Sequence, residues 1–532
     1  MSRRRILKNL VDLMSGTLLS RVMGFLRELV TASYFGTGKA MDLFVIAFTI
    51  PTFFRRFLGE DVVERAFMPP FKRLLSQKKH PEAWRLLSSC LNIMLIALII
   101  FMVLLYLIAP LLINVLAPGL DESLMPQAIK MTYWILPFMV IIGLAAFVGG
   151  MLNFFEMNRI YSTAPAMLSV GIIIGIIFFK PFMESHNISG MYALPAGFLL
   201  GGLFEFLIQV PFLFSKKIKQ ETTPHYTPKI DVHEQEFRNV GRESGFIVLR
   251  SLVDKSVEII DRRLASYLMS GSIASLWFAQ RLIQLPAAII GLSISRAIVP
   301  YLTERKALTA EDDFLKGIRT GIRLNFWLTI PATMLFIVLN EPIINIVYRR
   351  GAFDAESVRL TSIAFWCYAL GLLGMGLSVF FSQIYSVFQK NKIPFYTAVV
   401  SAILNIALKF VLVRTPLKHG GIALASSIAF SVYALLIFYF LRKELQNKIT
   451  FGYLGAQMLP VTLVCTIIGI GMYFVYSHLL FPWLEPSTLH IFIKNAIYLA
   501  GISGLSLFLF AGYVVLWGPD DLKLYFKKLA QR

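Results

Sequence analysis

The chain alternates between long apolar runs and short polar connections over its whole length. The run "LNIMLIALIIFMVLLYLIAPLLI" (91–113) exceeds the ~18 residues that indicate a membrane-spanning helix. No polar stretch longer than 216–242 interrupts the pattern, which leaves no room for a separate soluble enzyme domain. The pattern predicts an all-α polytopic membrane protein with fourteen spans, at 11–34, 40–58, 84–110, 130–153, 161–180, 190–215, 244–268, 273–299, 321–340, 358–386, 394–413, 420–441, 455–479 and 490–517.

Two short segments are echoed later in the chain at nearly the same offset. "ASYFGTGKAMDLF" (32–44) is similar to "ASYLMSGSIASLW" (265–277), 233 residues on, and "RAFMPPF" (65–71) is similar to "RAIVPYL" (296–302), 231 residues on. Apart from chance similarity, the echoes indicate that spans seven to twelve repeat spans one to six. Since six is even, the copies are parallel repeats, which are typical of transporters.

This repeat predicts the domain organisation of the chain. Two six-helix lobes are followed by two additional C-terminal helices. The predicted parts are an N-lobe at 1–215, a cytoplasmic basic linker at 216–243, a C-lobe at 244–445, and spans thirteen and fourteen with a cytoplasmic tail at 446–532.

The distribution of basic residues predicts the orientation. The chain is 57% hydrophobic and only 15% charged, yet its formal net charge is +20. Most lysines and arginines fall on alternate connections, so both termini are predicted to be cytoplasmic. We expect these residues to contact membrane lipid headgroups, not nucleic acid. The outward connections hold few basic residues, namely Lys39, Lys130, Lys180, Arg349, Arg350, Arg414 and Lys418.

The residue types that carry out catalysis or hold metals are sparse. Cys90, Cys367 and Cys465 each lie alone in an apolar run, which favours packing over a disulfide or a metal site. The seven histidines show no paired spacing typical of zinc sites. A lipid-linked glycosyltransferase needs an acidic metal motif or a loop base, and a scaffold would not explain charges inside spans. We therefore predict a protein without enzyme activity, metal or cofactor.

The first span carries charge where charge is expensive. In "SRVMGFLRELV" (20–30), Arg21 lies near mid-span, where an arginine costs ~2.5–3.5 kcal/mol. Gly24 and Glu28 share its helical stripe, but Glu28 lies two turns from Arg21 and cannot pair with it directly. Span eight adds Arg281. Several arginines without matching carboxylates favour a water-filled cavity for an anion, and guanidinium groups suit phosphate oxygens.

Two further arginines lie near the cytoplasmic end of span two. For Arg55 and Arg56, snorkelling to the surface and a role in the cavity remain equal alternatives. Span seven holds Arg250, Asp254, Glu258 and Arg262 at four-residue intervals, so neighbours can pair along one stripe. A self-neutralised packing face and a moving gate helix remain alternatives for this stripe.

At these residues the chain resembles a known family. "SRVMGFLRELVTASYFG", "MDLFVIAFTIPTFFRRFLGE" and "AFMPPF" are similar to the N-terminal signature of the MurJ (MviN) lipid II flippases, a family of the multidrug/oligosaccharidyl-lipid/polysaccharide exporter superfamily. The resemblance continues through "FAQRLIQLP" (278–286), "YRRGAFD" (348–354) and "QKNKIPF" (389–395). It implies alternating access and peptidoglycan precursor transport. The alternatives are a flippase for another polyprenyl-diphosphate oligosaccharide and a drug exporter of the superfamily.

The resemblance also implies roles for individual residues. Arg21, Arg27 and Arg281 would line a cationic cavity that holds the lipid II diphosphate, and Arg55 and Arg56 would attract it at the mouth. The candidate gate residues are Asp42, Glu60, Gly24 and Glu28. The last two spans would form a groove for the polyprenyl tail, in a protein that we expect to be a monomer.

The chain departs from the family pattern at several positions. Thr52 stands in place of asparagine and Asp61 in place of glycine, which weakens the gate assignment. Gln280 stands where an aspartate is common, which leaves Arg281 without its adjacent partner. Lys409 follows Asn405 by one turn, where some family members would have a carboxylate for sodium. This fixed cation argues against sodium coupling, and favours membrane potential or protons as the energy source.

Overall fold

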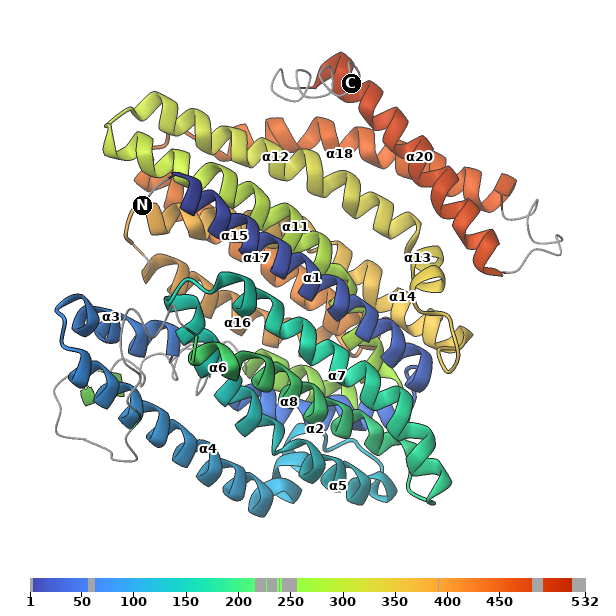
Figure 1. Cartoon of the computed structure of the whole chain (residues 1–532). Helices are drawn as coiled ribbons and strands as arrows, with labels where there is room; N and C mark the ends of the chain where they lie inside the picture. The colour runs from blue at the N-terminus through green and yellow to red at the C-terminus, as the bar shows by residue number, and fades with distance from the viewer. Residues whose placement is uncertain are drawn as a thin grey trace. The chain divides into compact units, whose positions relative to one another are not determined.

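The computed structural model describes residues 3–55, 63–215, 226, 237–238, 240–241, 256–390, 392–480 and 491–518, and these form helices joined by short turns, with no strand among them (Figure 1). The chain divides into two compact units. Unit 1 comprises Met1–Ala274 with Arg350–Phe353, and unit 2 comprises Ser275–Arg349 with Asp354–Arg532. The all-helical prediction is confirmed, whereas the predicted lobe boundaries stay a prediction.

Ten of the described helices are long and apolar enough to cross a membrane, and the bent pair α14–α15 makes eleven. The three remaining predicted spans fail this test for visible reasons. Helix α1 is rich in charge, α2 is only 17 residues long, and much of 244–268 lies outside the described residues. The protein is therefore a multi-pass membrane protein, and the number fourteen stays a prediction.

Unit 1 is organised around helix α7. This helix contacts α1 and α8 along its length (Figure 1). A Cβ atom on Gly171 or Gly175 would collide with the backbone of Gly201 or Gly197, so α7 and α8 pack backbone against backbone. The elements of unit 1 are α1 (Arg3–Phe35), α2 (Lys39–Arg55), η2 (Val63–Phe67), α3 (Met68–Ser76), α4 (His80–Leu116), η3 (Glu122–Leu124), α5 (Met125–Ile135), α6 (Phe138–Phe154), α7 (Asn158–Ser185), η4 (Gly190–Tyr192), α8 (Ala193–Leu213) and a helix over 256–266.

In unit 2, helix α17 packs against α14, α15 and α16, while α12 contacts α15 and α18. The bend of 43° between α14 and α15 breaks the span predicted at 358–386. The elements of unit 2 are α11 (Ser272–Ala307, whose first three residues belong to unit 1), α12 (Glu311–Val338), α13 (Asn340–Tyr348), α14 (Ala355–Ala369), α15 (Leu372–Val387), α16 (Lys392–Leu412), α17 (His419–Glu444), α18 (Phe451–Phe474), η5 (Val475–Leu480) and α20 (Ile491–Trp517).

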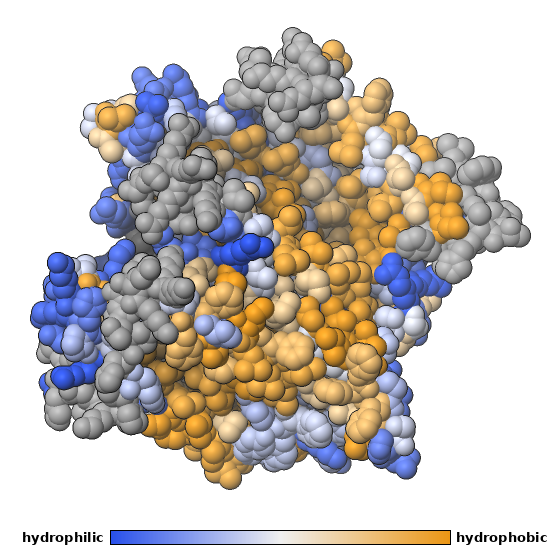
Figure 2. All heavy atoms as spheres, viewed as in Figure 1, coloured by the Kyte–Doolittle hydropathy of each residue, from blue (hydrophilic) through white to orange (hydrophobic). Residues whose placement is uncertain are grey.

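The surface of α4 shows the polarity expected of a lipid-facing helix. Figure 2 shows hydrophilic residues over α3 and hydrophobic residues along the following length of α4. Large apolar side chains exposed on α4 include Ile96, Ile100, Val103, Leu107 and Leu111. In water such a continuous apolar surface would be costly, whereas lipid chains cover it without penalty.

Candidate functional site

Arg27 and Glu28 form an ion pair on helix α1. Arg27 Nη2 donates to Glu28 Oε1 at 2.6 Å, and the two side chains are 16% and 8% exposed. The Arg27 guanidinium also lies 5.9 Å from the centre of the Phe198 ring on α8. The ion pair offsets the free-energy cost of removing the Glu28 carboxylate from water. The sequence reasoning missed it because adjacent side chains leave a helix about 100° apart, and only the length of arginine closes that gap.

Arg21 and Gly24 lie on the same helix in a more open setting. Arg21 is partly exposed and has no ion-pair partner among the described residues. A Cβ atom on Gly24 would meet no other atom within 4 Å. The space beside Gly24 is therefore open, and the ligand role of Arg21 stays a prediction.

Asp42, predicted as a gate residue, joins the start of α2 to the start of α11 within unit 1. Its buried carboxylate accepts the backbone N–H of Gly271 at 2.5 Å and that of Ala274 at 2.7 Å. Gly271 immediately precedes α11, and Ala274 lies in its first turn, where the N–H groups have no partner inside the helix. Asp42 therefore caps a helix more than 220 residues away in sequence, and it connects segment 32–44 to its echo.

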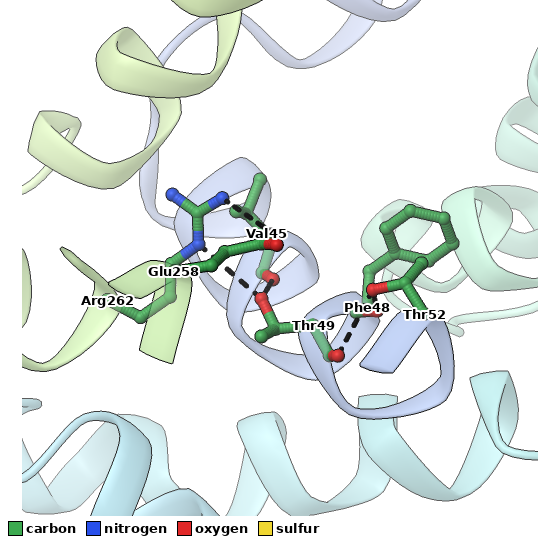
Figure 3. Close-up of polar contacts among 6 residues, drawn as sticks. All are labelled: Val45, Phe48, Thr49, Thr52, Glu258 and Arg262. Atoms are coloured by element: carbon green, nitrogen blue, oxygen red, sulfur yellow. Dashed lines mark hydrogen bonds and ion pairs between the residues drawn. The ribbon is translucent and has the colours of Figure 1, made fainter. Parts of the chain in front are cut away.

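Arg262 extends this polar contact along α2 (Figure 3). Its Nε donates to Thr49 Oγ1 at 3.4 Å, and its Nη2 lies 3.6 Å from Glu258 Oε1. Thr49 in turn donates to the carbonyl of Val45 at 2.8 Å. The side chain of Arg262 is only 4% exposed, so the guanidinium binds α2 rather than solvent. The predicted pairing of Glu258 with Arg262 is observed, while the choice between packing face and gate helix stays open.

Arg281 lies on α11 in unit 2, one turn after an aromatic residue. Its guanidinium carbon is 4.3 Å from the centre of the Trp277 ring, a close cation–π contact. Gln280, which replaces the common aspartate, therefore does not leave Arg281 unsupported. The spacing of four residues on a helix is the sequence signal for this contact, and the sequence reasoning overlooked it.

Helix α16 reverses the usual distribution of polar and apolar residues. Its four buried residues are all polar, namely Thr397, Ser401, Asn405 and Lys409, spaced by four along one face. Apolar residues of the same helix, including Tyr396, Val400 and Ile403, are exposed. The prediction that Asn405 and Lys409 share a face is confirmed, and the energy source of transport stays a prediction.

Several predicted residues cannot be placed. The side chain of Arg55, at the end of α2, lies outside the described residues, and so do Arg56, Glu60, Arg250 and Asp254. Their roles stay predictions.

An apolar depression lies between α12, α18 and α20 of unit 2. Its lining includes Met334, Val338, Gly469, Met472 and Phe510. The last two spans therefore share an apolar recess with α12, and the polyprenyl groove that the family resemblance implies for these spans stays a prediction.

The described part of the chain contains no group of three histidine, cysteine, aspartate or glutamate residues that could hold a metal ion. Cys90, Cys367 and Cys465 are buried on three different helices, α4, α14 and α18, and none of these three is in a disulfide. Buried cysteines of this kind behave as small apolar residues.

Comparisons with known proteins identify the family of this chain. The family model described as lipid II flippase MurJ matches residues 31–493. The chain is 27% identical over 488 residues to the probable lipid II flippase MurJ of Buchnera aphidicola subsp. Acyrthosiphon pisum, covering 90% of this chain and 91% of that protein. It is 28% identical over 525 residues to the probable lipid II flippase MurJ of Borreliella burgdorferi, covering 97% of each.

Solved structures share the fold. The lipid II flippase MurJ in an inward closed conformation superposes with a TM-score of 0.76 at 22% identity, covering 98% of this chain and 100% of that one. A multidrug resistance MATE family transporter of the MOP superfamily, in an inward-facing conformation, gives a TM-score of 0.65 at 14% identity, covering 82% and 98%. Since the family model spans most of the sequence, the chain belongs to the lipid II flippase MurJ family.

Proposed function

We propose that this protein moves lipid II, the lipid-linked peptidoglycan precursor, from the inner to the outer leaflet of the bacterial inner membrane by alternating access. The observation that carries the proposal is the presence of partly exposed arginines inside predicted spans of both units, Arg21 and Arg27 on α1 and Arg281 on α11. A charge kept inside a membrane helix against its insertion cost marks a transport pathway.

The diphosphate of the substrate is the group that these arginines would hold. Arg21 adjoins open space, and the stacked Trp277 ring orients the guanidinium plane of Arg281. A planar guanidinium can give two parallel hydrogen bonds to phosphate oxygens. Arg27 has a different role from Arg21 and Arg281. It is already paired with Glu28, so an arriving diphosphate competes with the Glu28 carboxylate for the Arg27 guanidinium.

The remaining predicted roles complete the proposal. Arg55 and Arg56 attract the headgroup at the cytoplasmic mouth, and the apolar recess of α12, α18 and α20 accepts part of the polyprenyl tail. Both termini lie in the cytoplasm, and the protein acts as a monomer that leaves its substrate chemically unchanged.

Asp42 remains our candidate gate residue, together with Glu60, Gly24 and Glu28. The hydrogen bonds from Gly271 and Ala274 support this role for Asp42, because they tie the beginning of α2 to another helix through one carboxylate. A link made by a single side chain can be broken and remade at modest cost.

The decisive experiment combines complementation with reconstitution. The gene should restore growth to a bacterium depleted of its own flippase, and the purified protein in liposomes should expose fluorescent lipid II in the opposite leaflet. Excess unlabelled lipid II should compete. Stronger competition by another polyprenyl-diphosphate oligosaccharide, or by cationic drugs, would instead assign the protein to one of the alternative functions.

A further inference from the structure

A hollow of about 470 Å³ lies at one end of unit 1, apart from the arginines of the proposed cavity. It is formed where α1 ends, α2 begins and α7 ends. Its volume falls in the range of sites for small ligands, ~300–1,000 Å³. We call it the lysine hollow, and its polar lining includes Tyr34, Lys39, Gln127, Lys180, Glu184 and Ser189.

Lys180 has a defined position on the wall of the lysine hollow. Its Nζ donates to the carbonyl oxygen of Tyr34 at 2.8 Å, at the C-terminal end of α1. The same ammonium lies 5.5 Å from the centre of the Tyr34 ring and 5.2 Å from that of Phe35. A lysine has three donor hydrogens, so this hydrogen bond leaves donors for a ligand.

Glu184 follows Lys180 by one turn, yet the two do not form an ion pair. Glu184 lies against Gly190, where a Cβ atom would come within 2.5 Å of Glu184 Oε1 and 3.0 Å of Lys180 Cγ. Glycine at 190 therefore makes room for both side chains. Lys39 and Glu184 are exposed and have no ion-pair partner in the described part of the chain, so the hollow presents both signs of charge.

The location makes these lysines unusual. The charge asymmetry predicts that the ends of α1 and α7 face outward, where lysine is rare. Of the few outward basic residues, Lys39 and Lys180 both line this one hollow. Neither residue serves the orientation of the protein, which favours a binding role.

We propose that the lysine hollow binds a short peptide carrying a free carboxylate and a free ammonium group, and that in the flippase this is the peptide of the precursor as it reaches the outer side. Lys39 and Lys180 receive the carboxylate and Glu184 receives the ammonium. The second half of the proposal rests on the proposed function, whereas the binding site itself does not.

Binding is measured on the full-length protein in detergent, without transport. The probe is the tripeptide Nα-acetyl-L-lysyl-D-alanyl-D-alanine, which has one free ammonium and one free carboxylate. Saturable binding is expected, with affinity falling at least fivefold in Lys180→Gln and in Lys39→Gln. Lys130→Gln is the matched control, an outward lysine of unit 1 that does not line the hollow, and it should bind like the parent.

Matched ligands test the charge assignment. Glu184→Gln should weaken binding of the parent peptide but not of its ε-acetylated form, and the lysine variants should not affect a C-terminally amidated form. Gly190→Ala, which displaces Glu184, should resemble Glu184→Gln. No saturable binding, or an equal effect of Lys130→Gln, would overturn the proposal.

Two further results separate this site from its alternatives. Tighter binding of glycerophosphoethanolamine, which carries a phosphate and an ammonium, would replace the peptide with a lipid headgroup and overturn our assignment. If this protein binds the peptide but does not flip lipid II, the proposed binding site stands and only the proposed function is refuted.

Discussion

Helices α1 and α16 both carry cations inside predicted spans, but the protein surrounds these cations differently. On α1, Arg21 is partly exposed beside open space at Gly24. On α16, Lys409 is fully buried at the end of a polar stripe. A cation next to open space can meet a ligand, whereas an enclosed cation acts on its own helices. The comparison supports the substrate-binding role proposed for α1 and favours an internal electrostatic role for Lys409 on α16.

The largest effect is expected at Arg21. Arg21→Ala should abolish complementation with normal protein levels in the membrane, because a hydrogen bond to a charged group is worth about 1.5–3 kcal/mol. Arg21→Lys should rescue only partly, since an ammonium lacks the planar fork. Arg359→Ala is the control, because Arg359 is exposed and paired with Glu356 outside the predicted cavity. Full activity of Arg21→Ala would remove the distinction between α1 and α16.

The Arg27–Glu28 pair tests whether α1 also contains structural charge. Arg27→Ala leaves the buried Glu28 carboxylate without this partner and should lower the free energy of unfolding by about 3 kcal/mol. The double variant Arg27→Ala/Glu28→Gln should recover most of that loss, measured by thermal unfolding in detergent. Both variants should fail to complement. Single and double variants that are both as stable as the parent would show that the pair does not stabilise the fold.

The role of Lys409 is tested by ion replacement. Flipping should continue when sodium is replaced by potassium, because a buried ammonium one turn from Asn405 repels a bound sodium ion. It should fall when the membrane potential is collapsed, since each charge crossing the field exchanges ~2.3 kcal/mol per 100 mV. Lys409→Asp should gain a sodium response that the parent lacks. Strict sodium dependence of the parent would contradict this interpretation of α16.

Asp354 carries an ordinary solvated charge and serves as the reference for the charges on α1 and α16. Its substitution is expected to have the smallest effect of the four predictions. It caps α14 by accepting the Ser357 N–H at 2.8 Å, and this hydrogen bond lowers the pKa of the Asp354 carboxyl. A lowered pKa means that the carboxylate stabilises the fold above its unfolded pKa of about 3.9, and that this contribution is lost as pH falls through the folded value. Asp354→Ala should cost about 1 kcal/mol at pH 7. The difference from the parent should disappear in acid, and Asp354→Asn should cost less.

The sequence predicted the helices of this protein better than its contacts. The all-helical class and the shared face of Asn405 with Lys409 follow from apolar runs and from 3.6-residue periodicity, which are local. The cap of α11 by Asp42 does not follow, because its donors lie 229 and 232 residues away. The break between α14 and α15 was also missed, although it falls at Gly371, the first glycine of "GLLGMG" (371–376), because packing decides whether glycines in an apolar run bend the helix.

The contact between Asp42 and the start of α11 has an evolutionary consequence. If segment 32–44 and its echo at 265–277 descend from one ancestral sequence, the two copies have since specialised. One copy supplies the carboxylate, and the other supplies backbone N–H groups at Gly271 and Ala274 and has serine at the position matching Asp42. Each copy has become part of the other's local structure. Exchanging the two segments would therefore not regenerate the protein, although their sequences still resemble each other.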